Sequence, residues 1–353
     1  RSGESVFGRC QVIRIILAPA RYIVENVFAD RYKRGGKMIG KRTAIWKREE
    51  YSYESEERDI PYVISYMHED GQIRPAMIVV PGGAYRQVSS SEGDIVARTF
   101  YRAGYNALVL TYSVNPTSEG EPLHLQPLRD LARTVRLVRY YAKQCRIDPE
   151  KVAVCGFSAG GHLCGSLGVH FQDIKEENSL LKEVSCRPDA MILGYPVITS
   201  GKYRNEDSFL ALLGEDSDEE EREYLSVEKH VTEEMPPCFL WHTLEDKTVS
   251  AENGYLFAEA CRKAGVPYAH HVFAEGAHGM SVATEEWFEQ KLKERPDKWT
   301  EEEQAHIYGA LDEVGMWTGL AKRWLKRTLC IKERQEIDSE DFIYQTWRSG
   351  LHK

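Results

Sequence analysis

The segment VAVCGFSAGGHL (152–163) carries the strongest indication of the fold. It joins an apolar run typical of a buried strand to a glycine-rich segment that predicts the start of a helix. Gly156, Ser158 and Gly160 form G-x-S-x-G at this junction. The glycines permit a tight strand-to-helix turn that holds the serine in strained backbone geometry. Ser158 is therefore the predicted nucleophile, and the backbone N–H of Ala159 is a predicted donor to a developing oxyanion.

Short apolar runs that end in turn residues recur on both sides of this junction. They are IPYVISYMHEDG (60–71), RPAMIVVPGG (74–83), YNALVLTYSV (105–114), DAMILGYPV (189–197), PCFLWHT (237–243) and YAHHVFAEG (268–276). Because the runs are continuously apolar, we expect strands covered on both faces. Helix patterns at 128–138 and 252–264 alternate with them. This order predicts an α/β fold with a doubly wound, mostly parallel sheet, helices on both faces and a short helical cap insertion at 199–234.

A serine hydroxyl is a weak nucleophile near neutral pH, so a base and an orienting acid are expected downstream, in the order Ser, acid, His. Asp246 follows the run FLWHT, and His278 follows the next run in EGAHG. Both positions lie where the carboxyl ends of parallel strands open onto a site. Glu245, next to Asp246, is the alternative acid. The other histidines of these segments are expected to be packed within the fold: His162, His242, His270 and His271.

The segment VVPGGAY, residues 79–85, supplies a candidate oxyanion loop. A glycine pair after a strand lets bare backbone N–H groups approach a tetrahedral intermediate. Gly83 and Ala84 are therefore predicted as donors together with Ala159. Tyr85 and Tyr195 are candidates for lining an aromatic, polar substrate pocket, or else structural residues. No metal or organic cofactor is expected.

Taken together and in this order, PGGAY (81–85), GFSAGGHL (156–163), HTLEDKTV (242–249) and EGAHG (275–279) resemble the α/β-hydrolase superfamily. More narrowly, they resemble its acetyl-esterase and xylan-esterase branch, a carbohydrate-esterase group that includes feruloyl-esterase-like enzymes and lies near the hormone-sensitive-lipase-like esterases. The resemblance implies an α/β-hydrolase fold with Ser158, Asp246 and His278 as the catalytic triad. It also implies hydrolysis of short-chain esters, acetyl above all, on plant-derived carbohydrate.

Three positions depart from the pattern of that superfamily. Ala84 stands where a third glycine is common, Pro81 where a histidine is found in one version, and Ser250 where a proline is usual. None removes a catalytic group, because an oxyanion loop works through backbone N–H groups. Two other functions stay open at this stage: an amide hydrolase of the arylformamidase or peptidase type, and a non-catalytic binding protein on the same fold.

The chain has 353 residues and 42% hydrophobic composition, enough for one large domain with its own core. The motif spacing predicts a catalytic domain at 59–329, flanked by extensions at 1–58 and 330–353. Residues 1–50 hold 12 Lys and Arg against 5 Asp and Glu, although the whole chain carries a net charge of −9. An amphipathic helix at about 20–34 is expected in this basic extension, as a cap over the acidic insertion or as a homodimer element.

Composition also bounds the partners and the compartment. The eight cysteines are scattered without a CxxC pair, which predicts buried thiols and argues against zinc. The scattered, unpaired cysteines favour a reducing cytoplasm as the compartment. No run approaches the length of a membrane span, and no secretory signal is recognised. The expected partner is a small-molecule or oligosaccharide ester. Nucleic acid is not expected, because the basic residues lack interleaved aromatic side chains.

Overall fold

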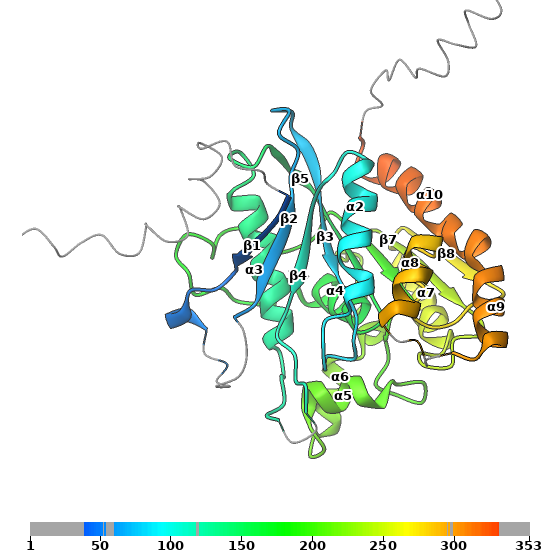
Figure 1. Cartoon of the computed structure of the whole chain (residues 1–353). Coiled ribbons are helices and arrows are strands. Elements are labelled where there is room, and N and C mark those ends of the chain that lie inside the picture. Colours follow the sequence, from blue (N-terminus) through cyan, green and yellow to red (C-terminus); the bar gives the residue numbers. More distant parts are fainter. Residues whose placement is uncertain are drawn as a thin grey trace, which may run out of the picture.

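The computed structural model describes residues 39–51, 53, 60–117, 120–294, 296 and 299–331 (Figure 1). Within them, one eight-stranded sheet has the order β1-β2-β4-β3-β5-β6-β7-β8. The strands are β1 (Ile39–Ala44), β2 (Tyr62–Tyr66), β3 (Arg74–Val80), β4 (Asn106–Thr111), β5 (Ile147–Phe157), β6 (Ala190–Gly194), β7 (Cys238–Thr243) and β8 (Tyr268–Phe273). Strands β3 to β8 run parallel to one another, whereas β1 pairs antiparallel with β2, and β2 pairs antiparallel with β4. The predicted mostly parallel sheet is therefore confirmed.

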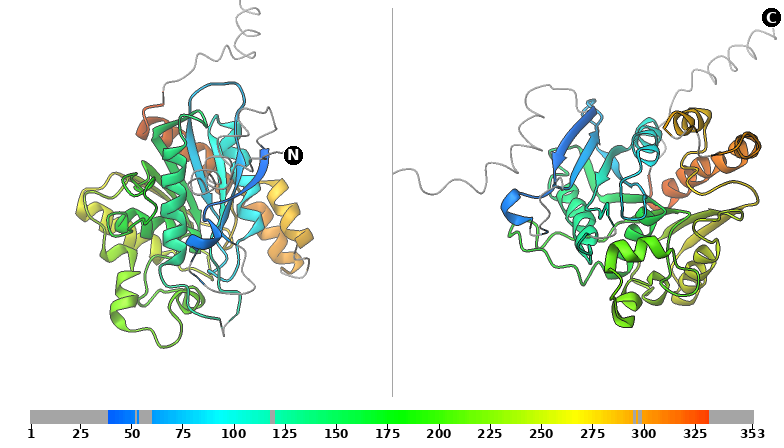
Figure 2. Two further views of the ribbon diagram at one scale, coloured as in Figure 1. Left: turned by 90° about the vertical axis from the view of Figure 1, so that its left-hand side faces the viewer. Right: turned by 60° about the horizontal axis from the view of Figure 1, so that its bottom comes forward.

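Helices cover both faces of this sheet (Figures 1 and 2). The α-helices are α2 (Asp94–Arg102), α3 (Gln126–Tyr140), α4 (Ala159–His170), α5 (Glu206–Leu213), α6 (Glu219–Tyr224), α7 (Glu252–Ala264), α8 (Glu285–Glu294), α9 (Glu301–Gly309) and α10 (Leu311–Thr328). Short 3-10 helices are η1 (Arg48–Glu50), η2 (Ser90–Glu92) and η3 (Val227–Lys229). The helix patterns at 128–138 and 252–264 correspond to α3 and α7.

The continuously apolar strands divide their side chains between two cores. Along β3, Ile78 and Val80 face one core with α3, α4 and α7, whereas Met77 and Val79 face the other with α2, α8 and α10. Successive strand side chains point to opposite faces, so a strand buried on both sides must be apolar throughout. This is the physical reason that the runs do not alternate.

The sheet begins earlier than predicted. β1 pairs with β2 and lies before residue 59, the predicted start of the catalytic domain. Trp46 then donates its indole N–H to buried Asp130 of α3 at 2.7 Å. Tyr51 shares a hydrogen bond with Ser113 at 2.7 Å. A boundary at 59 is therefore wrong, because residues 39–51 belong to the packed unit; the predicted helix at 20–34 lies outside the described residues.

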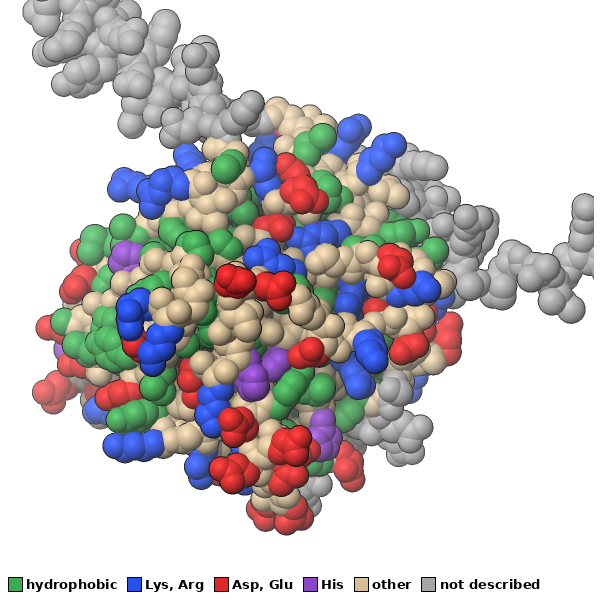
Figure 3. All heavy atoms as spheres, turned by 180° about the vertical axis from the view of Figure 1, so that it is seen from behind, with side chains coloured by type: hydrophobic (Ala, Val, Ile, Leu, Met, Phe, Trp, Pro, Cys, Tyr) green, Lys and Arg blue, Asp and Glu red, His purple; other side chains and the backbone are tan. Residues whose placement is uncertain are grey.

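The insertion at 199–234 contains α5, α6 and η3, as predicted. It lies beyond the carboxyl ends of the parallel strands, at the lower end of Figure 1, and the right-hand view of Figure 2 brings this end forward. Acidic side chains gather at the lower edge of the face shown in Figure 3. In Figure 1, α6, whose first turn contains Glu219, Glu220 and Glu221, lies at the same lower end of the molecule. Any pairing of these side chains with the basic residues 1–38 lies outside the described part of the chain.

Two further expectations concern thiols and membranes. Six of the described cysteines are buried, and Cys330 is exposed: the buried ones are Cys145, Cys155, Cys164, Cys186, Cys238 and Cys261. Desolvation raises the pKa of the Cys145 thiol to about 11, so this side chain acts as an apolar filler. Among the described helices, none combines the length and the apolar character that crossing a bilayer requires.

Candidate active site

A strained turn at the end of β5 presents Ser158. Its backbone has φ 53° and ψ −121°, and α4 begins at the next residue. The flanking glycines are sterically required: a Cβ on Gly156 would lie 2.2 Å from the carbonyl oxygen of Gly160, and one on Gly160 would lie 2.1 Å from that of Val80. These are backbone atoms that cannot move aside. The G-x-S-x-G spacing thus produces the sharp strand-to-helix turn that the sequence predicts.

Tertiary structure brings the three predicted triad side chains into one hydrogen-bonded chain. Ser158 Oγ lies 2.9 Å from Nε2 of His278. Nδ1 of His278 lies 2.6 Å from Oδ2 of Asp246. A carboxylate can only accept, so Nδ1 carries a proton, and Nε2 is placed to accept the Ser158 hydroxyl proton. This is the arrangement that a serine nucleophile needs.

The loop after β7 fixes Asp246 on its other side. Oδ1 of Asp246 accepts the backbone N–H groups of Thr248 at 2.9 Å and Val249 at 2.8 Å. The ring of His242 is completely buried beside it, with Nε2 3.4 Å from Oδ2. Burial alone would raise the pKa of Asp246, but the hydrogen bonds from His242, His278 and Val249 outweigh burial and hold that pKa below its usual range. Asp246 therefore stays ionised and oriented.

Glu245, the alternative acid, points elsewhere. Its Oε2 accepts the backbone N–H of Gly276 at 3.0 Å and contacts Nε2 of His306 at 2.6 Å. These contacts join the loop after β7 to the loop that carries His278 and to α9. Of the two adjacent carboxylates, only Asp246 contacts the His278 ring within the described structure.

The loop after β3 has the backbone geometry of an oxyanion site. The carbonyl of Gly82 accepts the N–H of Ser89, and the carbonyl of Gly83 accepts the N–H groups of Arg86 and Gln87. In a trans peptide, the C=O and the following N–H point in opposite directions. The N–H groups of Gly83 and Ala84 therefore point away from these anchored carbonyls, and among the described residues neither donates to a protein acceptor.

The N–H of Ala159 completes the predicted donor set. It belongs to the first residue of α4, where an N–H has no intrahelical partner. The two segments are pressed together, because a Cβ on Gly160 would also lie 2.4 Å from the carbonyl oxygen of Pro81. Gly83 at φ 123° and Ala84 at φ 53° show that the loop adopts backbone geometry outside the usual regions.

The structure does not support a substrate-lining role for the two tyrosines. Tyr85 and Tyr195 are each 1% exposed. The Tyr85 hydroxyl lies 2.8 Å from Nδ1 of His162, whose Nε2 donates to the carbonyl of Leu225 at 2.8 Å. Desolvation raises the pKa of both tyrosines well above the ordinary value. Aromatic residues that follow strand ends are typical of pocket linings, but here their hydroxyl groups form buried hydrogen bonds with neighbouring segments.

The four histidines that were expected to be packed within the fold are all at least partly buried. His162 and His242 are buried within α4 and β7. Desolvation lowers the pKa of His162 to about 4, so its ring is neutral. His270 and His271 lie in β8, and burial likewise lowers their pKa values, that of His270 to about 4.

Sequence reasoning missed one buried carboxylate, Glu92. It is 4% exposed, accepts the N–H of Gly82 at 2.7 Å and accepts the hydroxyl of Tyr195 at 2.8 Å. Its surroundings in the sequence, SSSEGD, are typical of a solvent-exposed turn. No local signal distinguishes it, because its partners are distant in the chain.

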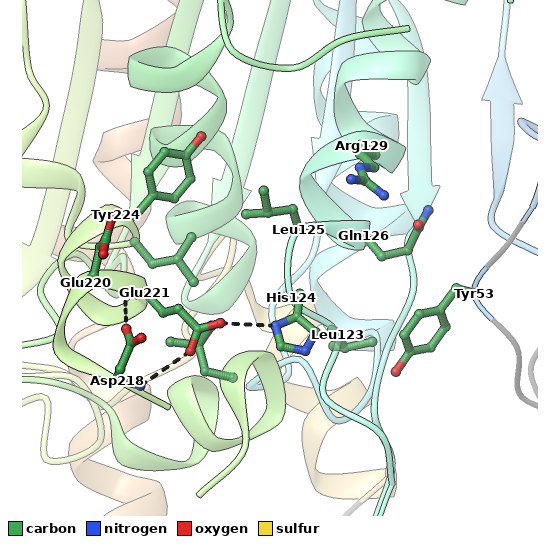
Figure 4. Close-up of a pocket in the computed structure, with 12 residues that line it drawn as sticks. Tyr53, Leu123, His124, Leu125, Gln126, Arg129, Asp218, Glu220, Glu221 and Tyr224 are labelled. Atoms are coloured by element: carbon green, nitrogen blue, oxygen red, sulfur yellow. Dashed lines mark hydrogen bonds and ion pairs between the residues drawn. The ribbon is translucent and has the colours of Figure 1, made fainter. Parts of the chain in front are cut away.

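Two hollows flank this end of the sheet. A cleft of about 830 Å³ borders Asp246 and His278, and its far wall includes Trp299, Glu302 and His306. A second hollow of about 670 Å³ lies between α6 and the start of α3, where Figure 4 shows Nδ1 of His124 facing Oε1 of Glu221. No triad residue lines the second hollow, so the first is the one that adjoins the candidate chemistry.

Residues 64–261, more than half of the chain, match the BD-FAE family. The chain belongs to the BD-FAE family. This BD-FAE chain has the α/β-hydrolase fold, since it resembles the crystal structure of an acetyl ester-xyloside bifunctional hydrolase from Caldicellulosiruptor lactoaceticus. That similarity has a TM-score of 0.69 at 34% identity, over 82% of this chain and 96% of the other.

Two curated relatives of the BD-FAE chain carry xylan-related names. It is 47% identical over 247 residues to Endo-1,4-beta-xylanase B of Butyrivibrio fibrisolvens, and 28% identical over 222 residues to an Acetylxylan esterase of Xylanibacter ruminicola. The matches cover 70% and 60% of this chain but only 39% and 42% of those proteins. The chain thus spans about two fifths of the length of these relatives. The predicted enzyme class, a carboxylic ester hydrolase, matches the name of the Xylanibacter ruminicola relative and that of the Caldicellulosiruptor lactoaceticus structure.

Proposed function

We propose that this protein is a serine esterase that removes short acyl groups, acetyl in particular, from plant-derived carbohydrate. The observation that carries the proposal is the Ser158–His278–Asp246 hydrogen-bonded chain beside the loop after β3, in which the N–H groups of Gly83 and Ala84 donate to no acceptor among the described residues. Acyl transfer by a serine enzyme uses a nucleophile, a base, an orienting acid and oxyanion donors, and candidates for all four lie together here.

In the proposed reaction, Ser158 Oγ attacks the ester carbonyl carbon while Nε2 of His278 takes the hydroxyl proton. The carbonyl oxygen becomes negative and accepts N–H groups of Gly83, Ala84 and Ala159. The C–O bond to the alcohol then breaks, and the leaving oxygen takes the proton from His278. Water attacks the acyl-serine by the same route, which releases the carboxylic acid and restores Ser158.

The surroundings of the triad favour a short acyl group and a larger polar leaving group. Ser158 is only 8% exposed, which favours a small acyl group at the nucleophile. The cleft of about 830 Å³ begins at His278, the group that must protonate the leaving oxygen. Its mixture of Trp299 with carboxylates and His306 suits a saccharide, which presents apolar ring faces and many hydroxyl groups. The names of the relatives, Acetylxylan esterase among them, support the same substrate class.

The test uses the full chain and three substrates: 4-nitrophenyl acetate, acetylated xylo-oligosaccharides and N-formylkynurenine. We expect the two acetyl esters to be cleaved, and the Ser158→Ala variant to lose turnover by more than about 1000-fold with an unchanged thermal midpoint. Labelling of Ser158 by a fluorophosphonate probe should disappear in the same variant. Hydrolysis by Ser158→Ala at the wild-type rate would overturn the proposal. A strong preference for N-formylkynurenine would assign an arylformamidase instead.

A further inference from the structure

The buried carboxylate of Glu92 is the strongest feature that the proposed reaction leaves unused. It lies in η2, directly after the oxyanion loop, and among the described residues it forms no ion pair. Burying an unpaired charge is costly unless strong hydrogen bonds compensate it. Both of its oxygens are engaged: Oε2 with the N–H of Gly82 at 2.7 Å, and Oε1 with the hydroxyl of Tyr195 at 2.8 Å. Such charge-assisted bonds are short and strong.

These two bonds extend into a chain across the active site. The Tyr195 hydroxyl donates to Glu92 and accepts the backbone N–H of Ser281 at 3.0 Å. Ser281 lies in the same loop as His278, and the ring of Tyr195 lies 5.0 Å from the His278 ring, measured between centroids. Glu92 and Tyr195 therefore connect the oxyanion loop after β3 to the histidine loop after β8.

The near end of this chain touches the nucleophile. A Cβ placed on Gly82 would lie 2.8 Å from Cβ of Ser158 and 3.0 Å from Oε2 of Glu92. The backbone of Gly82 thus lies against both the nucleophile and the carboxylate. Its carbonyl belongs to the peptide whose N–H is that of Gly83, the first predicted oxyanion donor. A displacement of Gly82 would displace that donor directly.

We propose that Glu92 is a positioning residue that sets the distance between the oxyanion donors and His278; this inference rests on the proposed esterase function. The carboxylate anchors Gly82 through one oxygen and the histidine loop, through Tyr195, with the other. Donors and base then keep their geometry as charge develops on the substrate oxygen. Glu92 acts on the reaction through these loops and makes no contact with the reacting atoms.

The experiment compares Glu92→Gln with Tyr195→Phe, their double variant and a control. Gln keeps an acceptor for Gly82 but loses the charge, and Phe removes the hydroxyl that joins the two loops. Asp130→Asn is the matched control, because Asp130 is also buried and accepts several hydrogen bonds, those of Trp46, Ser113 and Gln126, away from the triad. For each variant, kcat, KM and thermal midpoint are measured with 4-nitrophenyl acetate. The affinity of a trifluoromethyl ketone, which forms a tetrahedral adduct with serine, is measured alongside.

We expect Glu92→Gln to lower kcat by about 10-fold to 100-fold with little change in KM, since a misplaced oxyanion donor affects the transition state alone. Ketone affinity should fall by the same factor. The double variant should lose no more kcat and ketone affinity than the less active single variant, because both substitutions act on the same series of hydrogen bonds. Asp130→Asn should lower the thermal midpoint without changing ketone affinity.

Two results would overturn the inference: wild-type ketone affinity and kcat in Glu92→Gln, or an equal loss of ketone affinity in Asp130→Asn. The first would show that the loops hold their spacing without the carboxylate. The second would show that any buried carboxylate has this effect through stability. Failure of the esterase proposal is distinguishable, because it appears as turnover by Ser158→Ala.

Discussion

Replacing Asp246 by Asn tests which acid orients the candidate base. Oδ1 of Asp246 accepts the N–H groups of Thr248 and Val249, and Oδ2 faces Nδ1 of His278 at 2.6 Å. An Asn has one acceptor oxygen, which the two backbone N–H groups would retain. Its NH₂ group would then face Nδ1 of His278 and force the ring into the tautomer with a proton on Nε2. That tautomer cannot take the proton of Ser158.

We expect Asp246→Asn to lower kcat for 4-nitrophenyl acetate by about 10⁴-fold, which is about 5.5 kcal/mol of transition-state stabilisation. The matched control is Glu245→Gln at the adjacent position. Glu245 contacts Gly276 and His306, so its replacement removes about one hydrogen bond and should cost less than about 10-fold. Stopped assays at enzyme concentrations high enough to measure a 10⁴-fold loss are required, with the thermal midpoint of both variants as a check on folding.

Two results would contradict the assignment of Asp246 as the orienting acid. One is activity of Asp246→Asn within about 10-fold of wild type, and the other is an equal loss in Glu245→Gln. The first result would mean that the Asp246–His278 hydrogen bond does not select the tautomer. The second would mean that the loop connection through Glu245 matters as much as the direct contact.

Three further outcomes follow from the packing and the charges. Gly160→Ala should destabilise the fold by about 3 kcal/mol or more, because its Cβ would lie 2.1 Å from the carbonyl oxygen of Val80. Gly319→Ala, whose Cβ would meet nothing within 4 Å, should instead stabilise α10 by up to about 1 kcal/mol. Urea unfolding measures both free-energy changes. Asp246 has a lowered pKa in the folded state, so its contribution to stability is present above about pH 4 and is lost as pH falls below that value. The unfolding free energy of Asp246→Asn should therefore approach that of wild type on acidification. A difference in unfolding free energy that stays constant with pH would contradict this. The pKa of His162 falls from 6.5 to about 4 on folding, so the unfolded chain binds the extra proton and the free energy of unfolding should decrease from pH 7 to pH 5. In His162→Gln, the free energy of unfolding should change less over this pH range. An identical pH dependence in the variant would exclude His162 as its cause.

Much of the fold was predictable because its signals are local. Continuous apolar runs such as AMIVV of β3 require burial on both faces, and this requirement alone leads to a parallel sheet between helix layers. The boundary at residue 59 failed for the opposite reason. IGKRTA of β1 has few apolar residues, and it is a strand because its backbone pairs with β2.

For the candidate site, the turn at Ser158 and the order of the functional residues were predictable from local sequence. G-x-S-x-G forces a particular turn, since only glycine avoids the backbone atoms around Ser158. The sequence could not choose between Asp246 and Glu245, because adjacent side chains on a loop differ only in the direction that packing gives them.

The direction of Asp246 and Glu245, the burial of Tyr85 and Tyr195, and the position of Glu92 are all set by tertiary packing. Each of these outcomes depends on contacts between residues far apart in the chain, such as Tyr195 with Glu92 and with Ser281. Local sequence determines the backbone conformations that are sterically allowed. The partner that a side chain meets is determined by which strand ends the sheet brings together.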